Sequence, residues 1–339
     1  MKAGVIGAGA WGTAFSLYLA RLGNSVKLWV REPELLEIMR ATYENVLFLP
    51  GKNLPENVEF TDDASGAAKG CEILVFAVPV QKLRGVLEQI KIEGEPIVIN
   101  LAKGIEEQSL LFPSELIGSY FSNLDIVSLS GPSFAVEVAE GRPTVLVAAS
   151  HNEEIARYIR DRLSSPELRI YSSGDVVGVE LGGALKNVIA IAAGIVDAIG
   201  LGDNARAALI TRGLAEMTRL AIVIGAKLET MFGLAGLGDL LLTATSEKSR
   251  NYQFGRFLGK GAKVEEILKQ IRGIPEGVWT ARAALKLAEN FNVELPITYE
   301  VHSIIKGTST PPESVRRLME REYKDEWKDL ARLIAREAV

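Results

Sequence analysis

Short apolar runs alternate with longer amphipathic segments through the first half of the chain. The segments 14–23, 80–90 and 150–165 have the periodicity of helices. The apolar runs are nearly continuous in hydrophobic residues, which is typical of strands that are buried on both faces of a parallel sheet. These strands are expected at 2–8, 25–30, 72–78, 96–100, 125–130, 143–149 and 168–173. The alternation predicts an α/β domain, a doubly wound parallel sheet with helices on both faces.

The pattern changes near residues 174–178, at the sequence GDVVG. Beyond this point strand signals almost vanish, and apolar residues recur at helical spacing. Helices are expected at 178–198, 203–224, 262–271, 277–291, 296–306 and 312–337. We therefore predict two domains: residues 1–176 hold the sheet, and residues 177–339 form an all-α domain.

The composition is that of a folded protein with two domains. The chain has 339 residues, 47% of them hydrophobic and 24% charged, which is ample for two cores. Its net charge of −5 gives no extended basic field. This argues against a nucleic-acid partner and against recruitment by anionic lipid. A local basic pocket for a small anion stays compatible with such a charge.

The remaining bulk features favour a cytoplasmic location. The chain has one cysteine, Cys71, so no intrachain disulfide can form, as is usual in reducing compartments. The N-terminus enters a strand at once, without the apolar segment of a signal peptide. The apolar run 188–196 is too short to cross a bilayer. We expect a soluble protein without membrane insertion.

A glycine-rich turn follows the first expected strand. The sequence VIGAGAWGTAF spaces Gly7, Gly9 and Gly12 as GxGxxG between a strand and a helix, the context in which this motif binds dinucleotides. Gly7 permits the tight turn, Gly9 lets the backbone approach a pyrophosphate, and Gly12 lets helix and sheet pack closely. The N–H groups at the start of the helix receive the phosphates. The motif predicts a Rossmann-type domain; the alternative is a glycine turn without a ligand.

The residue that follows the second strand bears on the choice of cofactor. A carboxylate about 20 residues after the glycines would bind the adenosine ribose and favour NAD. The sequence has Arg31 there, followed by Glu32. Arginine can hold a 2′-phosphate and stack on adenine, so we expect NADP to be accepted, with NAD as a second cofactor. The alternative is a solvated surface arginine.

An amine lies within a helix that is otherwise built to be buried. The sequence GVELGGALKNVIAIAAGI (178–195) places Lys186 and Asn187 among apolar and small residues. A buried lysine that stays charged needs a partner. This combination indicates a polar site inside a packed helix, whereas the alternative is a lysine that extends to solvent.

Three further stretches carry candidate chemistry. Lys103 in NLAKGIE and Ser133 in SGPSFA follow expected strands, at the edge of a parallel sheet that faces ligands. Asp239 and Thr243 are spaced i, i+4 on one helix face, and Arg250 comes after a short turn. The alternatives are a loop lysine, a turn serine, an N-cap aspartate and an ordinary surface arginine.

Several motifs in order resemble the NAD(P)-dependent sn-glycerol-3-phosphate dehydrogenase family in its bacterial form. These are GAGAWGTA, FAVPVQ, NLAKGIE, SGPSFA, GVELGGALKNVIAIAAGI, GLAGLGDLLLTATS and SRNYQFG, and they cover nearly the whole chain. The resemblance implies reversible reduction of dihydroxyacetone phosphate to glycerol 3-phosphate with NAD(P)H, for phospholipid synthesis. A ketone that is reduced develops negative charge on its oxygen, and a positioned ammonium both stabilises that charge and delivers the proton.

The resemblance also implies roles for individual residues. Lys186 is the expected acid/base, Lys103 polarises the substrate oxygen, and Asp239 orients the lysines. The expected substrate-binding residues are Lys103, Gly131, Ser133, Asn187, Asp239, Thr243, Ser249, Arg250 and Asn251. The expected cofactor-binding residues are Gly7, Gly9, Ala10, Trp11, Gly12, Arg31, Lys103, Ala135, Arg250, Ile274 and Glu276.

Two other functions remain as alternatives. One is another dehydrogenase of the same layout, acting on 3-hydroxy acids, ketopantoate or opines; the phosphate-holding segment TSEKSRNYQFG argues against it. The other is a dinucleotide sensor without activity, which has no need of Lys103, Lys186 and Asp239 together. No metal is expected, because His151 and His302 lie outside any ligand-like cluster. The resemblance suggests a homodimer.

Overall fold

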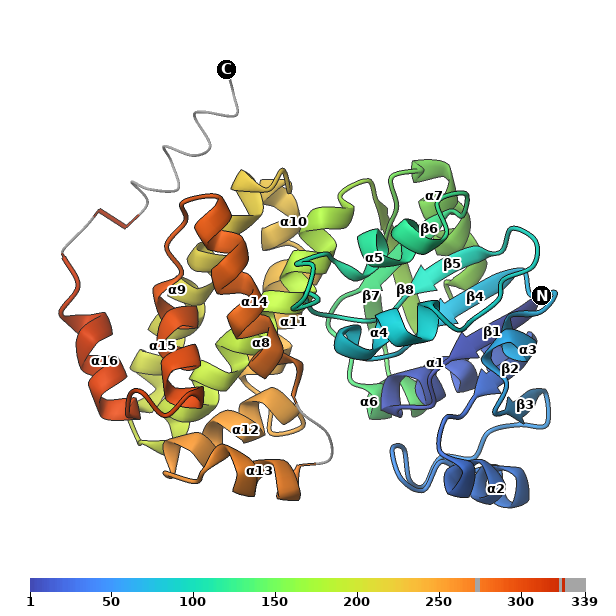
Figure 1. The fold of residues 1–339 in the computed structure, drawn as a ribbon, viewed down its shortest axis with the longest axis horizontal. Helices are drawn as coiled ribbons and strands as arrows, with labels where there is room; N and C mark the ends of the chain where they lie inside the picture. The colour runs from blue at the N-terminus through green and yellow to red at the C-terminus, as the bar shows by residue number, and fades with distance from the viewer. Residues whose placement is uncertain (272–274, 323–324, 327–339) are drawn as a thin grey trace. The chain divides into compact units, whose positions relative to one another are not determined.

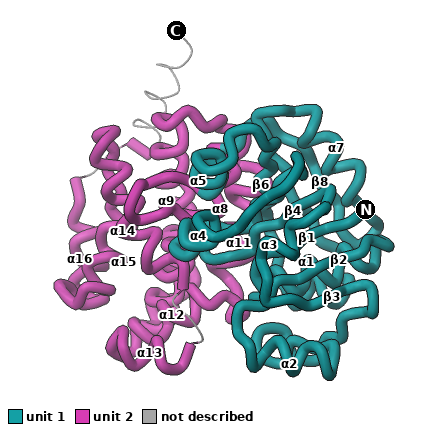
Figure 2. Tube along the Cα trace, turned by 45° about the vertical axis from the view of Figure 1, so that its right-hand side comes forward, with its two compact units in different colours: residues 1–103, 113–176 teal, residues 104–112, 177–339 magenta. Residues whose placement is uncertain are grey.

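The computed structural model describes residues 1–271, 275–322 and 325–326, and it divides the chain into two compact units. Unit 1 comprises residues 1–103 and 113–176, and unit 2 comprises residues 104–112 and 177–339 (Figure 2). The chain therefore passes between the units three times. The segment 104–112, which the sequence reading did not separate from the first domain, belongs to unit 2.

Unit 1 is built on an eight-stranded sheet with the order β3-β2-β1-β4-β5-β6-β7-β8 (Figure 1). The central strand β4 (Ile73–Phe76) is buried at every residue, as expected where helices cover both faces. The other strands are β1 (Lys2–Ile6), β2 (Ser25–Trp29), β3 (Val58–Thr61), β5 (Ile97–Asn100), β6 (Ile126–Ser130), β7 (Thr144–Ala149) and β8 (Leu168–Ser173). The helices are α1 (Ala10–Arg21), α2 (Pro33–Thr42), α3 (Ala64–Ala68), α4 (Val80–Leu87), α5 (Pro113–Tyr120), α6 (Ala135–Ala139) and α7 (Glu153–Leu163).

The predicted doubly wound sheet is confirmed, with two corrections. First, β7 runs antiparallel to β6, so the sheet is not parallel throughout. The helix between them, α6, has five residues and spans only about 7.5 Å, whereas a strand of five residues spans about 17 Å. A helix this short covers only part of the return distance that a parallel crossover needs. Second, the sequence reading missed β3, an edge strand of four residues in which only Val58 and Phe60 are buried.

Unit 2 contains no strand among its described residues, as the sequence predicts. Its core helix α8 (Val176–Ala198) is buried without interruption from Val179 to Val196. A helix that is apolar all round has to be packed on all sides. The other elements are α9 (Gly202–Val223), α10 (Leu228–Phe232), a π-helical turn (Leu234–Gly238), α11 (Asp239–Ala244), α12 (Arg250–Gly259), α13 (Val264–Gln270), α14 (Glu276–Asn290), α15 (Pro296–Ile305) and α16 (Pro311–Met319).

The length of α8 also bears on membranes. The helix has 23 residues and a mean hydropathy of 1.6, so by length and composition it could cross a bilayer, which the run 188–196 alone did not indicate. All of its apolar window is buried inside the protein. This is the behaviour of the core helix of a folded domain.

The last helix is shorter than predicted. The spacing predicts a helix over 312–337, but α16 ends at Met319, and residues 320–322 and 325–326 are not helical. Met319, the last residue of α16, is 77% exposed. The rest of the predicted helix, 323–324 and 327–337, lies outside the described residues.

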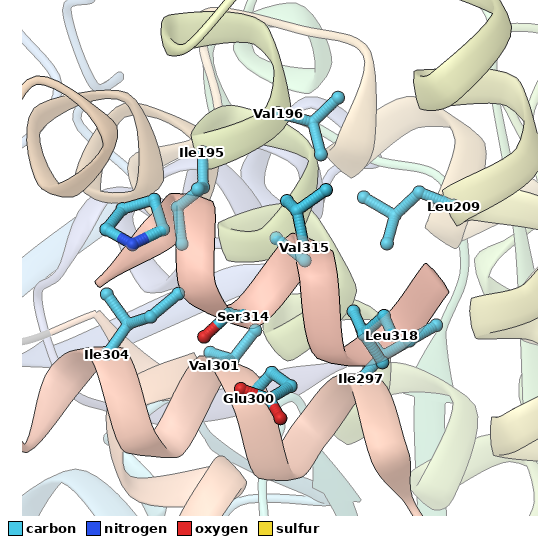
Figure 3. A pocket seen from close by; sticks show the side chains of 12 residues that line it. Ile195, Val196, Leu209, Ile297, Glu300, Val301, Ile304, Ser314, Val315 and Leu318 are labelled. Carbon is cyan, nitrogen blue, oxygen red and sulfur yellow. The ribbon is translucent and has the colours of Figure 1, made fainter. Parts of the chain in front are cut away.

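A small apolar cavity lies among α8, α9, α15 and α16 (Figure 3). Its lining includes Ile195, Leu209, Val301 and Val315. The volume is about 40 Å³, far below the roughly 300 Å³ or more of small-molecule sites. We therefore regard it as a packing gap of the helical core.

Candidate functional site

The glycine-rich turn of unit 1 has the geometry that a dinucleotide requires. Gly7 has φ +114°, and a Cβ there would lie 2.8 Å from the carbonyl oxygen of Ala77, so only glycine fits. A Cβ on Gly12 would lie 1.9 Å from the carbonyl oxygen of Gly7, because α1 packs directly against the turn. A Cβ on Gly9, by contrast, would meet nothing within 4 Å. The backbone at Gly9 is thus open to close approach by a ligand group such as a pyrophosphate.

The start of α1 completes this cradle. Gly9 is its N-cap and supplies no side-chain cap, and the first turn carries no acidic residue. The first intrahelical bond of the turn runs from the Thr13 N–H to the Gly9 carbonyl, at 2.9 Å. The N–H groups of Ala10, Trp11 and Gly12 therefore point past the end of the helix, toward any bound anion.

Asn45 supports the turn and was not identified from the sequence. Its side chain is fully buried, and Nδ2 donates to the Ala8 carbonyl and to Thr13 Oγ1, both at 2.8 Å. Its Oδ1 accepts from the Phe48 N–H at 3.0 Å. Asn45 is distant from the glycines in sequence, so no local pattern marks it.

The ends of β5 and β6 bring three predicted residues together. Lys103 Nζ donates to the Gly131 carbonyl at 3.3 Å, and Ser133 Oγ donates to the same oxygen at 3.1 Å. Asn100, the last residue of β5, shapes the preceding turn, since its Oδ1 accepts from the Ala102 N–H at 2.9 Å. A polar residue directly after an apolar run is the signal that would have found Asn100.

The other two predicted residues of unit 1 lie at the starts of helices. Ala135 is the first residue of α6, which is tied to α1 by a 2.7 Å bond from Arg21 Nη2 to the Ala139 carbonyl. Arg31 precedes α2, is largely exposed, and forms an ion pair with Glu32 at 2.5 Å. Binding of a 2′-phosphate by Arg31 would compete with this contact.

Unit 2 buries the predicted lysine together with a carboxylate. The side chain of Lys186 on α8 is 9% exposed, and it forms an ion pair with Asp239 on α11, which is fully buried. The reading of Lys186 as a lysine that extends to solvent is therefore wrong. Thr243, one turn after Asp239, donates to the Asp239 carbonyl at 2.7 Å and lies 3.4 Å from its Oδ1.

The chain around Asp239 sets its position. Asp239 directly follows the π-helical turn and begins α11, so it is not the N-cap that the sequence left open. Such turns widen a helix locally and recur at functional sites. A Cβ on Gly182 of α8 would lie 2.6 Å from the Ala235 carbonyl of that turn. Glycine in α8 thus permits the close backbone approach that brings Asp239 to Lys186.

A second polar group in unit 2 links three helices. Asn251 Nδ2 on α12 donates to Asn187 Oδ1 on α8 at 2.8 Å, and Asn251 Oδ1 accepts from the Gly277 N–H of α14 at 3.0 Å. Asn187 Nδ2 donates to the Gly183 carbonyl at 3.2 Å. Ser249 is the N-cap of α12, where its hydroxyl accepts from the Tyr252 N–H. These contacts fix Asn187 and Asn251 and hold the start of α12 in place.

An arginine and an acidic residue flank this group. Arg250, the first residue of α12, is exposed, and Glu276 begins α14. Burial raises the pKa of Glu276 from 4.5 to about 7, although the field of Arg250 acts in the opposite direction. Among the described residues, Glu276 Oε2 is buried without a hydrogen-bond partner. Such an oxygen can receive a donor from a ligand.

The predicted residues therefore fall into two sets. Unit 1 holds the glycine turn and the Lys103–Gly131–Ser133 cluster, and unit 2 holds the Lys186–Asp239 pair and the polar group around Asn251. Ile274 lies outside the described residues.

Known protein families match both halves of the chain. The model for the N-terminal part of NAD-dependent glycerol-3-phosphate dehydrogenase matches residues 2–156, and the model for the C-terminal part matches residues 175–316.

Individual relatives are similar to this chain along nearly its full length. The glycerol-3-phosphate dehydrogenase (NAD(P)+) of Koribacter versatilis is 46% identical over 94% of this chain and 96% of its own. That of Geobacter sulfurreducens is 46% identical over 96% of this chain and 98% of its own. The crystal structure of glycerol-3-phosphate dehydrogenase from Coxiella burnetii superposes with a TM-score of 0.91 at 38% identity, covering 94% of this chain and 99% of that one. With both halves and the whole fold in agreement, the chain belongs to the NAD-dependent glycerol-3-phosphate dehydrogenase family.

Proposed function

We propose that this chain interconverts dihydroxyacetone phosphate and sn-glycerol 3-phosphate, with Lys186 as the acid/base. The chain is an NAD(P)-dependent oxidoreductase of the glycerol-3-phosphate dehydrogenase family. The observation that carries the proposed mechanism is the buried ion pair of Lys186 and Asp239. A buried ammonium is costly unless it is paired, and buried charged groups are concentrated at functional sites. Supply of glycerol 3-phosphate for phospholipid synthesis is the proposed role.

In this proposal residues 1–176 form the cofactor domain. The open backbone at Gly9 and the N–H groups of Ala10, Trp11 and Gly12 fit a pyrophosphate. A nicotinamide bound there would supply the hydride that reduces C2 of the substrate, or accept it in the reverse direction. Further contacts to the cofactor are assigned to Arg31, Lys103, Ala135, Arg250, Ile274 and Glu276.

Residues 177–339 form the substrate domain in this proposal. The Lys186 ammonium donates a proton to the C2 oxygen as negative charge develops on it, and the neutral amine takes that proton back in the reverse direction. Asp239 holds the ammonium in one orientation, and Thr243 in turn restrains Asp239. No other group needs to move a proton at this oxygen.

Binding of the substrate phosphate is assigned to the start of α12. Arg250 offers a charge-assisted contact to a dianion, and Ser249 and Asn251 flank it. Asn187 is held by Asn251 and lines the same group. Lys103, Gly131 and Ser133 are proposed as further substrate contacts, with Lys103 polarising the C2 oxygen.

The alternatives are less well supported. A dehydrogenase for 3-hydroxy acids, ketopantoate or opines is not favoured, because both family models and the named relatives agree on glycerol-3-phosphate dehydrogenase. A sensor without activity does not account for a buried ammonium–carboxylate pair.

The test measures absorbance at about 340 nm with dihydroxyacetone phosphate and either NADPH or NADH. We expect turnover by the wild type and its loss in Lys186→Ala, with NADPH binding retained. Lys269→Ala, which removes an exposed lysine of α13, is the matched control and should stay active. A folded wild type that binds NADPH but does not reduce this ketone would contradict the proposal.

We also propose a cytoplasmic homodimer without membrane insertion. The complete burial of the apolar window of α8 supports the absence of insertion, and the family resemblance supports the dimer. Light scattering of the purified protein without detergent tests both, since a monomer or a detergent requirement would contradict them.

A further inference from the structure

The segment 104–112 is part of unit 2 although residues of unit 1 lie on both sides of it in sequence. Its end residues are anchored in the apolar core of unit 2. Ile105 is fully buried and Phe112 is 5% exposed, and both belong to the same cluster as α8. Removing the segment from unit 2 would expose both apolar side chains to water, which is unfavourable.

The segment also has a defined internal structure. The Glu106 N–H donates to the Leu111 carbonyl at 3.0 Å, and the Leu110 N–H donates to the Glu106 carbonyl at 2.9 Å. The Ser109 hydroxyl donates to the Glu106 carboxylate. Leu110 adopts φ +62°, a left-handed conformation that leucine takes only when its surroundings enforce it. The segment is therefore a shaped loop rather than a slack connection.

An ion pair ties this loop to α14. Glu107 Oε1 lies 2.9 Å from Arg282 Nη1, and the two side chains are 20% and 53% exposed. Neither residue is among the cofactor and substrate contacts proposed above, so those functions do not account for the pair. It is one contact between a helix of unit 2 and the middle of the loop, an ion pair without hydrogen-bond geometry at Glu107 Oε1.

The first residue of the loop follows the proposed substrate-contacting lysine. Lys103 is followed directly by Gly104. Gly104 has φ +133°, a backbone conformation that residues other than glycine rarely adopt. We infer that the segment 104–112 is a positioning strap, which fixes the backbone at Lys103 to unit 2 through Glu107 and Arg282. The inference rests on the proposed function, in which Lys103 contacts the substrate. A displacement of about 1 Å at a catalytic group can cost a hundredfold in rate, so a modest shift of the strap is measurable.

The test uses Glu107→Gln and Arg282→Gln in the full-length enzyme. Each should lower kcat about threefold to fivefold, which is the factor that corresponds to the free energy of one partly exposed ion pair. Each should leave the Kd of NADPH unchanged. The exchanged pair Glu107→Arg with Arg282→Glu should return kcat to within about twofold of the wild type. Arg317→Gln breaks the comparable pair with Glu300 on α15 and is the matched control, with kcat unchanged.

Backbone amide exchange separates failure of the strap from failure of the proposed function. In Glu107→Gln the amides of Glu106 and Leu110 should exchange faster, while those of α8 keep the wild-type rate. Unchanged exchange and unchanged kcat in both single variants would overturn the strap. Loss of kcat without rescue by the exchanged pair would overturn it too. A wild type that fails to reduce dihydroxyacetone phosphate would contradict the proposed function, and the exchange rates would still decide the strap.

Discussion

Replacing Asp239 by Asn tests the central electrostatic feature of unit 2. The substitution keeps the size of the side chain but removes its charge. The side chain of Lys186 is 9% exposed and that of Asp239 is fully buried, so water cannot take over the role of the carboxylate. The ammonium would then lose the buried carboxylate that it contacts.

The size of the effect follows from this burial. Removing one member of a buried ion pair typically costs about 3–5 kcal/mol, because the remaining charge is uncompensated. At the lower value, openings that expose α8 become roughly a hundredfold more frequent. We also expect a large loss of kcat, since the acid/base loses the group that orients it.

Amide exchange followed by mass spectrometry measures the first effect. Peptides from α8 should exchange roughly a hundredfold faster in Asp239→Asn, while peptides from β4 in unit 1 serve as an internal control. In the double variant Lys186→Met with Asp239→Leu, apolar side chains of similar size replace the pair. Its exchange should return close to the wild-type rate without any return of activity.

Two results would refute this reasoning. One is wild-type exchange and a kcat within about threefold of the wild type in Asp239→Asn, which would mean that the pair carries neither stability nor chemistry. The other is a double variant that regains activity, because no proton donor of the proposed kind would remain.

Three further predictions concern the cofactor and pH. Gly9→Ala should leave unfolding unchanged but weaken NADPH binding, whereas Gly12→Ala should destabilise unit 1, because only the second Cβ meets backbone; calorimetry with and without NADPH distinguishes them. Arg31→Ala should weaken NADPH binding about tenfold or more and NADH binding little, and an equal loss for both in fluorescence titration would contradict this. The raised pKa of Glu276 means that the folded protein retains a proton that the unfolded chain releases, so the wild type should lose up to about 3 kcal/mol of stability between pH 4.5 and 7. Glu276→Gln should not lose it, which urea unfolding at pH 5 and pH 8 would show.

Much of the fold could be predicted because its signals are local. The GxGxxG spacing and the continuous apolar strands predict the sheet of unit 1. Both patterns can be recognised within short stretches of sequence. The direction of β7 depends on the length of α6, and β3 depends on its place at the edge of the sheet. Neither property is visible in a short window of sequence.

The same distinction holds for the site. Apolar neighbours mark Lys186 as a buried amine, but its physical partner lies 53 positions away. Periodicity places Asp239 and Thr243 on one face but does not indicate the π-helical turn before them. Asn45 and the Glu107–Arg282 pair are fixed by contacts across long stretches of chain, so no pattern in the residues alone reveals them.

The three passages of the chain between the units have a consequence for biosynthesis and for fragment design. Residues 104–112 are synthesised long before α8. Ile105 and Phe112 therefore stay exposed to solvent until the core of unit 2 that later covers them has been synthesised. A fragment cut at residue 176 would carry these two apolar side chains uncovered, and a fragment that starts at 177 would lack them. Neither half can be excised cleanly, and unit 2 can reach its final packing only after nearly the whole chain has been made.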